Sequence, residues 1–460
     1  MFLKSDRVLK TNLKTAHFEL LAPANNKNTA IKAIKAGADA VYIGAPKYGA
    51  RIQAGNSIED IIDVIEFAHK YRVKIYITLN TILKDNELPD VEKLIWKLYR
   101  INADGIIIQD MGILKLNLPP IALIASTQCN NNTLEKIKFL EETGFKRVIL
   151  PREMSLNQIK NISSNTKIEL ESFVHGALCM SYSGQCYLSY AIGKRSANRG
   201  ECAQPCRKKY SLKSFDGKYI IKDKHILSLK DLNLSDKLEE LIQSGITSFK
   251  IEGRLKNEAY VINTTAYYRQ ALDKILNNYN LKRSSDGVSY IDFEPDLNKT
   301  FNRGFTQFYI NASKKDISTI NYTSSLGEYI GVVDFVKKNY FSLKKNILNN
   351  GDGICFFNEN NELQGTNINK TEGNIVFPAC IKGIKQGVKI YRNYNKEFDD
   401  LLSTIDIKRK IPVKIKVREL ENDYIFFITD EENNTVCKMI NKNFEKAINT
   451  DTQDESFKNG

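Results

Sequence analysis

Eight short apolar runs alternate with helix-like segments over the first 255 residues of the chain. The runs are rich in Ile and Val and largely hydrophobic, which is typical of strands buried on both faces of a parallel sheet. They occupy residues 18–23, 40–44, 74–80, 105–110, 121–127, 147–151, 168–176 and 248–253. Helix-like segments lie between them at residues 28–36, 57–69, 91–101, 134–143 and 238–244. The pattern predicts an α/β fold, a TIM-like (β/α)8 barrel. A doubly wound open sheet is the alternative, but no G-x-G-x-x-G follows the first run.

The chain beyond the barrel changes to shorter predicted strands. Five of them, with Gly and Asn turns between Leu326 and Asn393, indicate a small antiparallel β-barrel domain. We therefore expect the TIM-like barrel over residues 1–285, a connecting segment packed on it over 286–325, the small β-barrel domain over 326–398, and a short C-terminal β-meander with a polar tail over 399–460.

Four of the eight cysteines lie within 28 residues, in the loop expected between the seventh and eighth strands, at about residues 175–210. They are Cys179, Cys186, Cys202 and Cys206, with the spacing C-x6-C-x15-C-x3-C. Clustered thiolates most often bind zinc or an iron–sulfur cluster. Structural zinc sites usually contain close cysteine pairs, and only Cys202 and Cys206 form one here. The spacing therefore favours an iron–sulfur cluster, with zinc and unliganded thiols as the alternatives.

Polar residues follow the predicted strands where the mouth of the barrel would lie. The carboxyl ends of barrel strands face a common mouth, so these residues should lie near one another: Asn80, Gln109, Gln128, Arg152, His175, Glu252 and Arg254. Lys250 alternates with Glu252 and Arg254 along the eighth strand, and alternation sends all three to one face. These charges would bind a carboxylate or phosphate of a substrate, or would form an internal ion-pair network. A second set is similarly placed to hold an anion beside the cysteines: Arg195, Asn198 and Arg199.

The chain is strongly basic, with a net charge of +13 at pH 7. One interpretation is a polyanionic partner, with RNA as the leading candidate, and the other is lysines spread over solvated surfaces. The sequence contains no stretch of about 18 consecutive apolar residues, so no membrane span is predicted. The N-terminus also lacks the apolar core of a signal peptide. We therefore expect a cytoplasmic protein whose cysteines are reduced thiols or metal ligands.

Common hydrolase motifs are absent from the sequence. It contains neither the H-E-x-x-H pattern of zinc proteases nor the G-x-S-x-G elbow of serine hydrolases. Cys179 and His175 could form the thiolate–histidine pair of a cysteine protease, but four clustered cysteines exceed that need.

Several segments resemble peptidase family U32, the collagenase-like proteases, and they do so in the same order. The run ESFVHGALCMSYSGQCYLS at 171–189 resembles the family signature. Five further segments support it: ELLAPA (19–24), GADAVYIG (37–44), ASTQ (125–128), RSANRGECAQPCR (195–207) and FKIEGRLK (249–256). The resemblance covers about residues 17–310 and extends more loosely into the small β-barrel domain. The terminal meander resembles the start of a collagenase-associated domain that is truncated here.

The resemblance implies an iron–sulfur protein that modifies RNA. The family includes oxygen-independent hydroxylation proteins for the wobble uridine of tRNA, for a cytidine of 23S rRNA and for an intermediate of ubiquinone synthesis. The small β-barrel domain that follows the TIM-like barrel favours the RNA-acting branch over the ubiquinone branch, whose members tend to lack such a domain. By resemblance, the four clustered cysteines would hold a [4Fe–4S] cluster, and prephenate, a dicarboxylate, would supply the hydroxyl group. The resulting hypothesis is C5-hydroxylation of a pyrimidine in tRNA or 23S rRNA.

This hypothesis assigns roles to the residues of the mouth. The expected proton-transfer residues are Glu171, His175 and Glu252. The expected substrate-binding residues are Asn80, Gln128, Arg152, Asn198, Arg199, Lys250 and Arg254. In the small β-barrel domain, Lys382, Tyr391 and Arg392 are expected to contact RNA. The sequence leaves open whether the chain acts with a partner protein or as a homo-oligomer. The alternative functions are a U32-type peptidase and a non-catalytic iron–sulfur scaffold.

Overall fold

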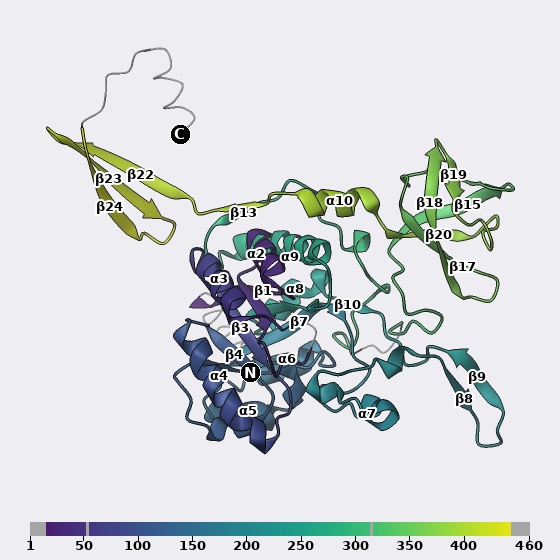
Figure 1. Cartoon of the computed structure of the whole chain (residues 1–460), viewed down its shortest axis with the longest axis horizontal. Helices are drawn as coiled ribbons and strands as arrows, with labels where there is room; N and C mark the ends of the chain where they lie inside the picture. Colours follow the sequence, from purple (N-terminus) through teal and green to yellow (C-terminus); the bar gives the residue numbers. More distant parts are fainter. Residues whose placement is uncertain (1–14, 52–54, 313–315, 443–460) are drawn as a thin grey trace, which may run out of the picture. The chain divides into compact units, whose positions relative to one another are not determined.

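The computed structural model of the chain describes residues 15–51, 55–312 and 316–442 (Figure 1). The chain forms two compact units that divide after Arg409. No helix in these described ranges is both long and apolar enough to cross a bilayer.

Eight parallel strands form a closed barrel in the first unit. Each strand pairs with the next in chain order, and the last pairs with both the first and the seventh, which closes the sheet. The strands are β1 (His17–Pro23), β2 (Ala40–Gly44), β3 (Lys74–Leu79), β4 (Gly105–Ile108), β5 (Ala122–Ala125), β6 (Arg147–Ile149), β7 (Glu169–Ala177) and β11 (Ser248–Ile251). The predicted TIM-like barrel is confirmed, and each of its strands lies within a predicted apolar run or overlaps it.

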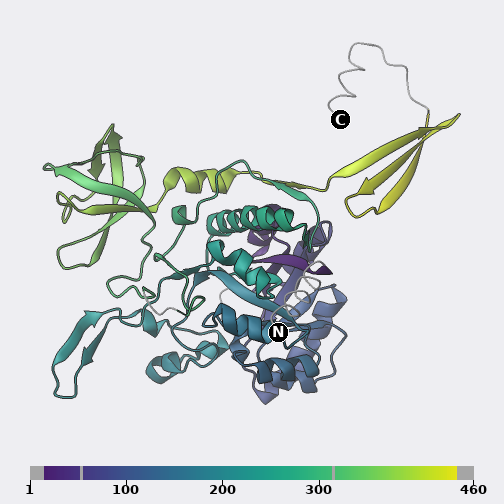
Figure 2. The same cartoon turned by 180° about the vertical axis from the view of Figure 1, so that it is seen from behind.

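Helices surround the strands on the outside of the barrel (Figures 1 and 2). They are α2 (Lys27–Lys35), α3 (Ile58–His69), α4 (Leu88–Arg100), α5 (Leu134–Glu142), α6 (Leu156–Ser163), α8 (Leu238–Gln243) and α9 (Glu258–Tyr279). Helix α6 was not predicted, although a capping box of Ser155 and Gln158 starts it and Ile159 and Ile162 face the core. The connection from β4 to β5 contains only the 3-10 turn Met111–Lys115.

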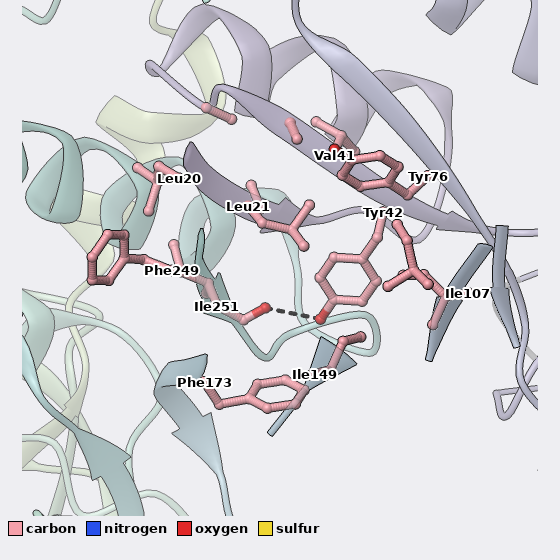
Figure 3. Close-up of a cluster of buried hydrophobic side chains, with 14 of the residues drawn as sticks. Leu20, Leu21, Val41, Tyr42, Tyr76, Ile107, Ile149, Phe173, Phe249 and Ile251 are labelled. Carbon is pink, nitrogen blue, oxygen red and sulfur yellow. Dashed lines mark hydrogen bonds between the residues drawn. The ribbon is translucent and has the colours of Figure 1, made fainter. Parts of the chain in front are cut away.

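Large apolar side chains from facing strands fill the barrel (Figure 3). Tyr42 of β2 points into the barrel interior, and its hydroxyl donates a 2.8 Å hydrogen bond to the carbonyl of Ile251 in β11, on the far side of the intervening strand β1. Phe173 of β7 and Ile149 of β6 lie on the other side of the same interior. A buried phenol needs such a partner, so this bond holds the ring in place.

A long insertion of 70 residues, 178–247, separates β7 from β11. It contains α7 (Leu188–Gly193), the hairpin strands β8 (Tyr210–Lys213) and β9 (Tyr219–Lys224), and β10 (Asp231–Asn233). β10 runs antiparallel to β7, and the short strand β14 (Phe305–Thr306) pairs with β10. The cysteine segment therefore leaves from the carboxyl end of β7, as predicted.

The small antiparallel barrel is also confirmed, with six strands rather than five. They are β15 (Glu328–Val336), β16 (Phe341–Leu343), β17 (Gly353–Phe357), β18 (Leu363–Glu372), β19 (Ile375–Pro378) and β20 (Lys389–Tyr394). The missed strand β18 has the polar sequence LQGTNINKTE, of which only Ile368 is buried. Its backbone pairing, rather than its side chains, holds it in the barrel.

The segment expected to begin the meander belongs partly to the first unit. Helix α10 (Lys396–Thr404) buries Phe398 and Leu402 against Ile262 of α9 and its neighbours. Strand β21 (Lys408–Lys410) pairs with β13 (Val288–Tyr290). The three-stranded antiparallel meander itself consists of β22 (Val413–Glu419), β23 (Asp423–Asp430) and β24 (Thr435–Asn441).

Candidate active site at the mouth of the barrel

A cavity of about 610 Å³ lies at the carboxyl end of the barrel strands. Its floor is apolar and consists of Tyr42, Ile107, Ile149 and Phe173. Its remaining wall is made largely by the insertion between β7 and β11. Enzymes with this fold have their active sites at this end of the barrel, which makes the cavity the candidate active site.

Most of the predicted site residues line this cavity. The polar residues among them are Asn80, Gln128, Arg152, Asn198, Lys250, Glu252 and Arg254, together with all four clustered cysteines. Five residues predicted at or beside the mouth do not line it, namely Gln109, Glu171, His175, Arg195 and Arg199. The polar residues that follow the predicted strands thus indicated where the mouth lies. The role of each of these residues depends on the side chains that it contacts.

Three arginines and one carboxylate set the charge of the cavity. Arg152 forms a 3.1 Å ion pair with Glu252, and Arg51 and Arg254 lie close enough to act on the same carboxylate. Burial by itself would raise the pKa of Glu252, but the charges of Arg51, Arg152 and Arg254 hold it below its ordinary value. These four side chains carry a net charge of +2, so the cavity favours an anion.

Two of these arginines have hydrogen-bonding capacity to spare. Arg254 is 5% exposed, donates to the hydroxyl of Thr78 at 2.8 Å and lies 5.5 Å from the ring centre of Tyr42. Arg152 stacks 3.6 Å above the ring of Phe173. Within the described part of the chain, the Nε atoms of Arg152 and Arg254 are buried without a hydrogen-bond partner. A buried donor without a partner is unfavourable, and a bound carboxylate would satisfy it.

A second layer of charge lies beneath the cavity and is already paired. Glu171 is fully buried and accepts from Lys250 at 2.7 Å and from Arg147 at 3.2 Å. Arg147 also binds Glu19 of β1. One of the two alternatives was an internal network of Glu252 with Lys250 and Arg254. Both cations act electrostatically on Glu252, but its direct ion pair is with Arg152, because β11 ends at Ile251 and Glu252 lies beyond it. Glu171 is placed to hold Lys250 rather than to meet a substrate.

The four clustered cysteines all line the cavity, and all four are free thiols. Burial raises the pKa of Cys179, and the neighbouring Cys186 and Cys202 raise it further. Burial also raises the pKa of Cys206, and its three cysteine neighbours add to the effect. Among residues 15–51, 55–312 and 316–442, no group of three or more His, Cys, Asp or Glu side chains is arranged tightly enough to hold a metal ion. Four thiols nevertheless line one cavity, and thiols are the ligand type that iron–sulfur clusters and zinc use in proteins.

Close backbone packing places the first part of the cysteine loop. Gly184 has φ +74°, and a Cβ at this position would lie 1.8 Å from the carbonyl oxygen of Gln128. No side chain can be accommodated there, so glycine allows the loop to rest on the end of β5. Thr127 donates to Ser183 at 3.2 Å across the same contact.

An ion pair holds the later part of the cysteine loop. Both terminal nitrogens of Arg199 donate to the carboxylate of Glu87, at 2.9 and 2.7 Å, and Ile82 donates through its backbone to Asn198. The hydrogen bonds from Arg199 lower the pKa of Glu87 to about 2. Arg199 thus points away from the cavity and positions Asn198, which lines it.

His175 is buried outside the cavity. Its ring packs between the rings of Tyr260, Tyr268 and Phe305, whose centres lie 5.5 to 6.0 Å away. Burial, and to a smaller extent the charge of Lys256, lowers the pKa of His175 to about 3. His175 therefore stays neutral near pH 7 and has a structural place rather than a place beside a substrate.

Replacing His175 with phenylalanine should remove part of the acid sensitivity of the fold. The pKa of His175 is about 6.5 in the unfolded chain and about 3 in the folded chain. Between these values only the unfolded chain binds the proton, so the free energy of unfolding falls as the pH falls from about 6.5 toward 3. Between pH 7.5 and pH 5 this amounts to about 2 kcal/mol. Urea unfolding at both pH values should show that the loss of unfolding free energy between pH 7.5 and pH 5 is smaller by about 2 kcal/mol in His175→Phe than in the wild-type protein. The exposed His17 is the control site, and an unchanged pH dependence in His175→Phe would contradict the assignment.

Sequence reasoning missed several residues of the cavity. Arg51 follows β2 in a loop without any strand-end signal, and Tyr42 and Phe173 were read as core strand residues. Arg392, expected to contact RNA, is instead 6% exposed and paired with Glu328 at 2.6 Å and with Asp352. An isolated arginine in a strand pattern does not reveal whether its partner lies across the same barrel.

Comparison with known proteins agrees with the sequence resemblance. The family model described as peptidase family U32 matches residues 25–320. The 23S rRNA 5-hydroxycytidine synthase of Escherichia coli is 41% identical over 452 residues, which cover 96% of this chain and 69% of that protein. A tRNA hydroxylation protein of Bacillus subtilis is 38% identical over 265 residues, covering 55% of this chain and 63% of that protein. A collagenase of Porphyromonas gingivalis is 29% identical over 430 residues, covering 89% of this chain and 98% of that protein.

Proposed function

The chain belongs to peptidase family U32, and from that membership and the cavity we propose that it hydroxylates a pyrimidine in RNA. The observation that carries the proposal is the match to the 23S rRNA 5-hydroxycytidine synthase, which extends over 96% of this chain and so includes the barrel, the insertion and the small β-barrel. A cytidine of 23S rRNA is the first candidate substrate, and the wobble uridine of tRNA is the second.

The proposed reaction favours an iron–sulfur cluster over zinc as the group that the four thiols would hold. Replacing a ring C–H by C–OH is a two-electron oxidation of the base, and zinc has no redox chemistry. We therefore propose that Cys179, Cys186, Cys202 and Cys206 hold a [4Fe–4S] cluster. When bound, the cluster would supply electron transfer beside the reacting base. The backbone N–H of Gln204 already donates to the sulfur of Cys202 at 3.4 Å, a contact that stabilises thiolate ligands.

The arginine-rich wall suits a dicarboxylate such as prephenate as the hydroxyl donor. The free Nε atoms of Arg152 and Arg254 supply directed donors, and the net charge of +2 supplies the attraction. In overall balance, the base exchanges C–H for C–OH while the donor carbon loses its hydroxyl and takes up hydrogen. Glu252, ionised at neutral pH, orients Arg152 and can accept a hydrogen bond from the donor.

The target base must leave its helix to react. A cavity of about 610 Å³ is in the size range of small-ligand sites and far too small for a duplex. The base is therefore unpaired or extruded. Two amide side chains of the cavity wall, Asn80 and Gln128, are candidates to contact the base. Asn80 donates a hydrogen bond to Gln128 at 2.9 Å, and Gln128 donates one to Gln109 at 3.1 Å. Such amides can donate to and accept from the edge of a base.

A peptidase is the second candidate, and the match to the Porphyromonas gingivalis collagenase favours it. The geometry supports it less well. No histidine is found among the described residues that line the cavity, so Cys179 has no histidine partner there. A cysteine nucleophile requires an adjacent base or another means of activation.

Complementation tests the proposed function directly. An Escherichia coli strain without its 23S rRNA 5-hydroxycytidine synthase would receive this chain, and nucleosides from rRNA and tRNA would be measured by mass spectrometry. We expect 5-hydroxycytidine to return to the rRNA. Absence of any hydroxylated pyrimidine in both RNA fractions, from a strain that makes the folded protein, would reject the proposal. Cleavage of gelatin by the purified chain would then favour the peptidase.

A further inference from the structure

A two-stranded hairpin with basic flanks, residues 207–224, follows the last clustered cysteine directly. We name it the basic arm. Its strands β8 and β9 pair with each other and with no other described strand, and Figures 1 and 2 both draw them as a separate ribbon. A lone hairpin is marginally stable in water, and this one contributes no residue to the apolar core of the barrel, so its use is other than building that core.

The basic arm is densely cationic. Its 18 residues include seven cationic side chains, Arg207, Lys208, Lys209, Lys213, Lys218, Lys222 and Lys224, against two acidic ones, Asp216 and Asp223. Five of the lysines, all but Lys224, are exposed. The resulting surplus of five positive charges on one hairpin is complementary to a polyanion.

Aromatic rings are exposed among these charges. Phe215 at the tip is fully exposed, and Tyr219 is 53% exposed. Lys213 and Lys222 lie 4.5 and 5.5 Å from the ring centre of Tyr219, so the three side chains share one face. Phosphate-binding cations beside stacking rings are the combination that binds single-stranded nucleic acid.

The tip of the arm has a defined turn. Gly217 donates through its backbone to Ser214 at 3.0 Å, and Ser214 donates to Lys218 at 2.9 Å. Gly217 has φ +83°, a conformation that glycine adopts without strain. Phe215 is therefore presented by a hydrogen-bonded turn, and no residue in the described part of the chain covers it.

The base of the arm is joined to the wall of the cavity. Tyr210 donates its hydroxyl hydrogen to the carbonyl of Pro205 at 2.8 Å, and Pro205 and Cys206 both line the cavity. Arg207 donates to the carbonyl of Leu178 at 3.3 Å, one residue before Cys179. A force on the arm would thus be transmitted to the cysteine segment.

We propose that the basic arm binds the RNA strand that flanks the target pyrimidine. This inference rests on the proposed function, which places an RNA base in the cavity next to the arm. The charge surplus favours RNA over a protein partner. Five residues from Tyr210 to Phe215, at about 3.3 Å each, put the tip within roughly 17 Å of the arm's base. Phe215 therefore stacks on a base several nucleotides from the target and does not fill the gap that an extruded base leaves.

RNA binding by the full chain tests the arm. Fluorescence anisotropy would follow a labelled single-stranded fragment of 23S rRNA that spans the target cytidine, over about 50 to 300 mM KCl. The variant Lys213→Ala/Lys218→Ala/Lys222→Ala should lower the slope of log affinity against log salt by about 2, which is roughly 100-fold weaker binding at 0.1 M salt. Phe215→Ala should weaken binding roughly 10-fold at every salt concentration and leave the slope unchanged.

Matched controls come from the outer helices of the TIM-like barrel. Lys93→Ala/Lys97→Ala/Lys138→Ala removes three exposed lysines, and Phe139→Ala removes an exposed phenylalanine. The arm proposal is overturned if its variants bind RNA like these controls, and loss of a co-purifying protein instead would identify a protein partner. Complementation separates the two proposals. If the wild-type chain restores 5-hydroxycytidine but the arm variants bind RNA as well as the wild type does, only the proposal for the basic arm is rejected. Arm-dependent binding by a chain that hydroxylates nothing would support the arm while the proposed function fails.

Discussion

Replacing Cys202 with alanine is expected to remove bound iron and to lower RNA hydroxylation by at least about 100-fold, while the fold stays intact. Cys202 is exposed on the wall of the cavity and contributes nothing to the apolar core. Its loss should therefore affect the ligand set and spare the packing. Iron and acid-labile sulfide content, the reduced EPR spectrum and the far-UV circular dichroism of protein purified without oxygen provide the measurements.

The matched control for this prediction is Cys380→Ala. Cys380 is also an exposed thiol, but it lies in the small β-barrel, outside the cavity. Both variants remove one accessible thiol, so only a ligand role distinguishes them. Full iron content in Cys202→Ala would show that the cluster, if present, is held elsewhere. Stoichiometric zinc in the wild-type protein would refute the redox role, because zinc cannot change its oxidation state.

Replacing Arg254 with glutamine is expected to raise the KM for the dicarboxylate donor by 30-fold or more. Truncating one partner of a buried charge pair costs about 2–5 kcal/mol, and the lower end of that range corresponds to about 30-fold. Arg254 is nearly fully buried and its Nε is unpaired within the described residues, and we propose a donor carboxylate as its partner. Steady-state kinetics with varied donor and saturating RNA would measure the effect.

The pH profile gives this prediction a second readout. Arg254 is one of the cations that lower the pKa of Glu252, so its removal raises that pKa. If ionised Glu252 is required, the acid limb of the activity profile moves to higher pH in Arg254→Gln. Arg254→Lys keeps the charge but not the forked donors, and should recover the pH profile better than the KM. Arg418→Gln, at an exposed position of the meander, is the control. An unchanged KM in Arg254→Gln would place the donor elsewhere.

The amino-acid sequence by itself determined the strand order of the barrel, its mouth and the place of the cysteine segment. These features are local, because a strand buried on both faces must be apolar along its own length and a long loop is visible as a gap between two such runs. The spacing of the four cysteines is likewise written in one continuous segment, 179–206. The missed strand β18 marks the limit of this reasoning, since a polar strand held by its backbone has no apolar pattern.

Only the tertiary structure decided which charges are paired and which are free. Arg152 and Glu252 meet across 100 residues of sequence, and Arg147 meets Glu19 across 128. Closure of the barrel places such residues opposite each other, and no local pattern encodes that register. The same closure buried His175 and turned Arg199 toward Glu87, while it left the Nε atoms of two cavity-lining arginines without a hydrogen-bond partner among the described residues. Residue types and spacing could therefore predict that the mouth is charged, but burial and pairing determine which of its charges remain to bind a substrate.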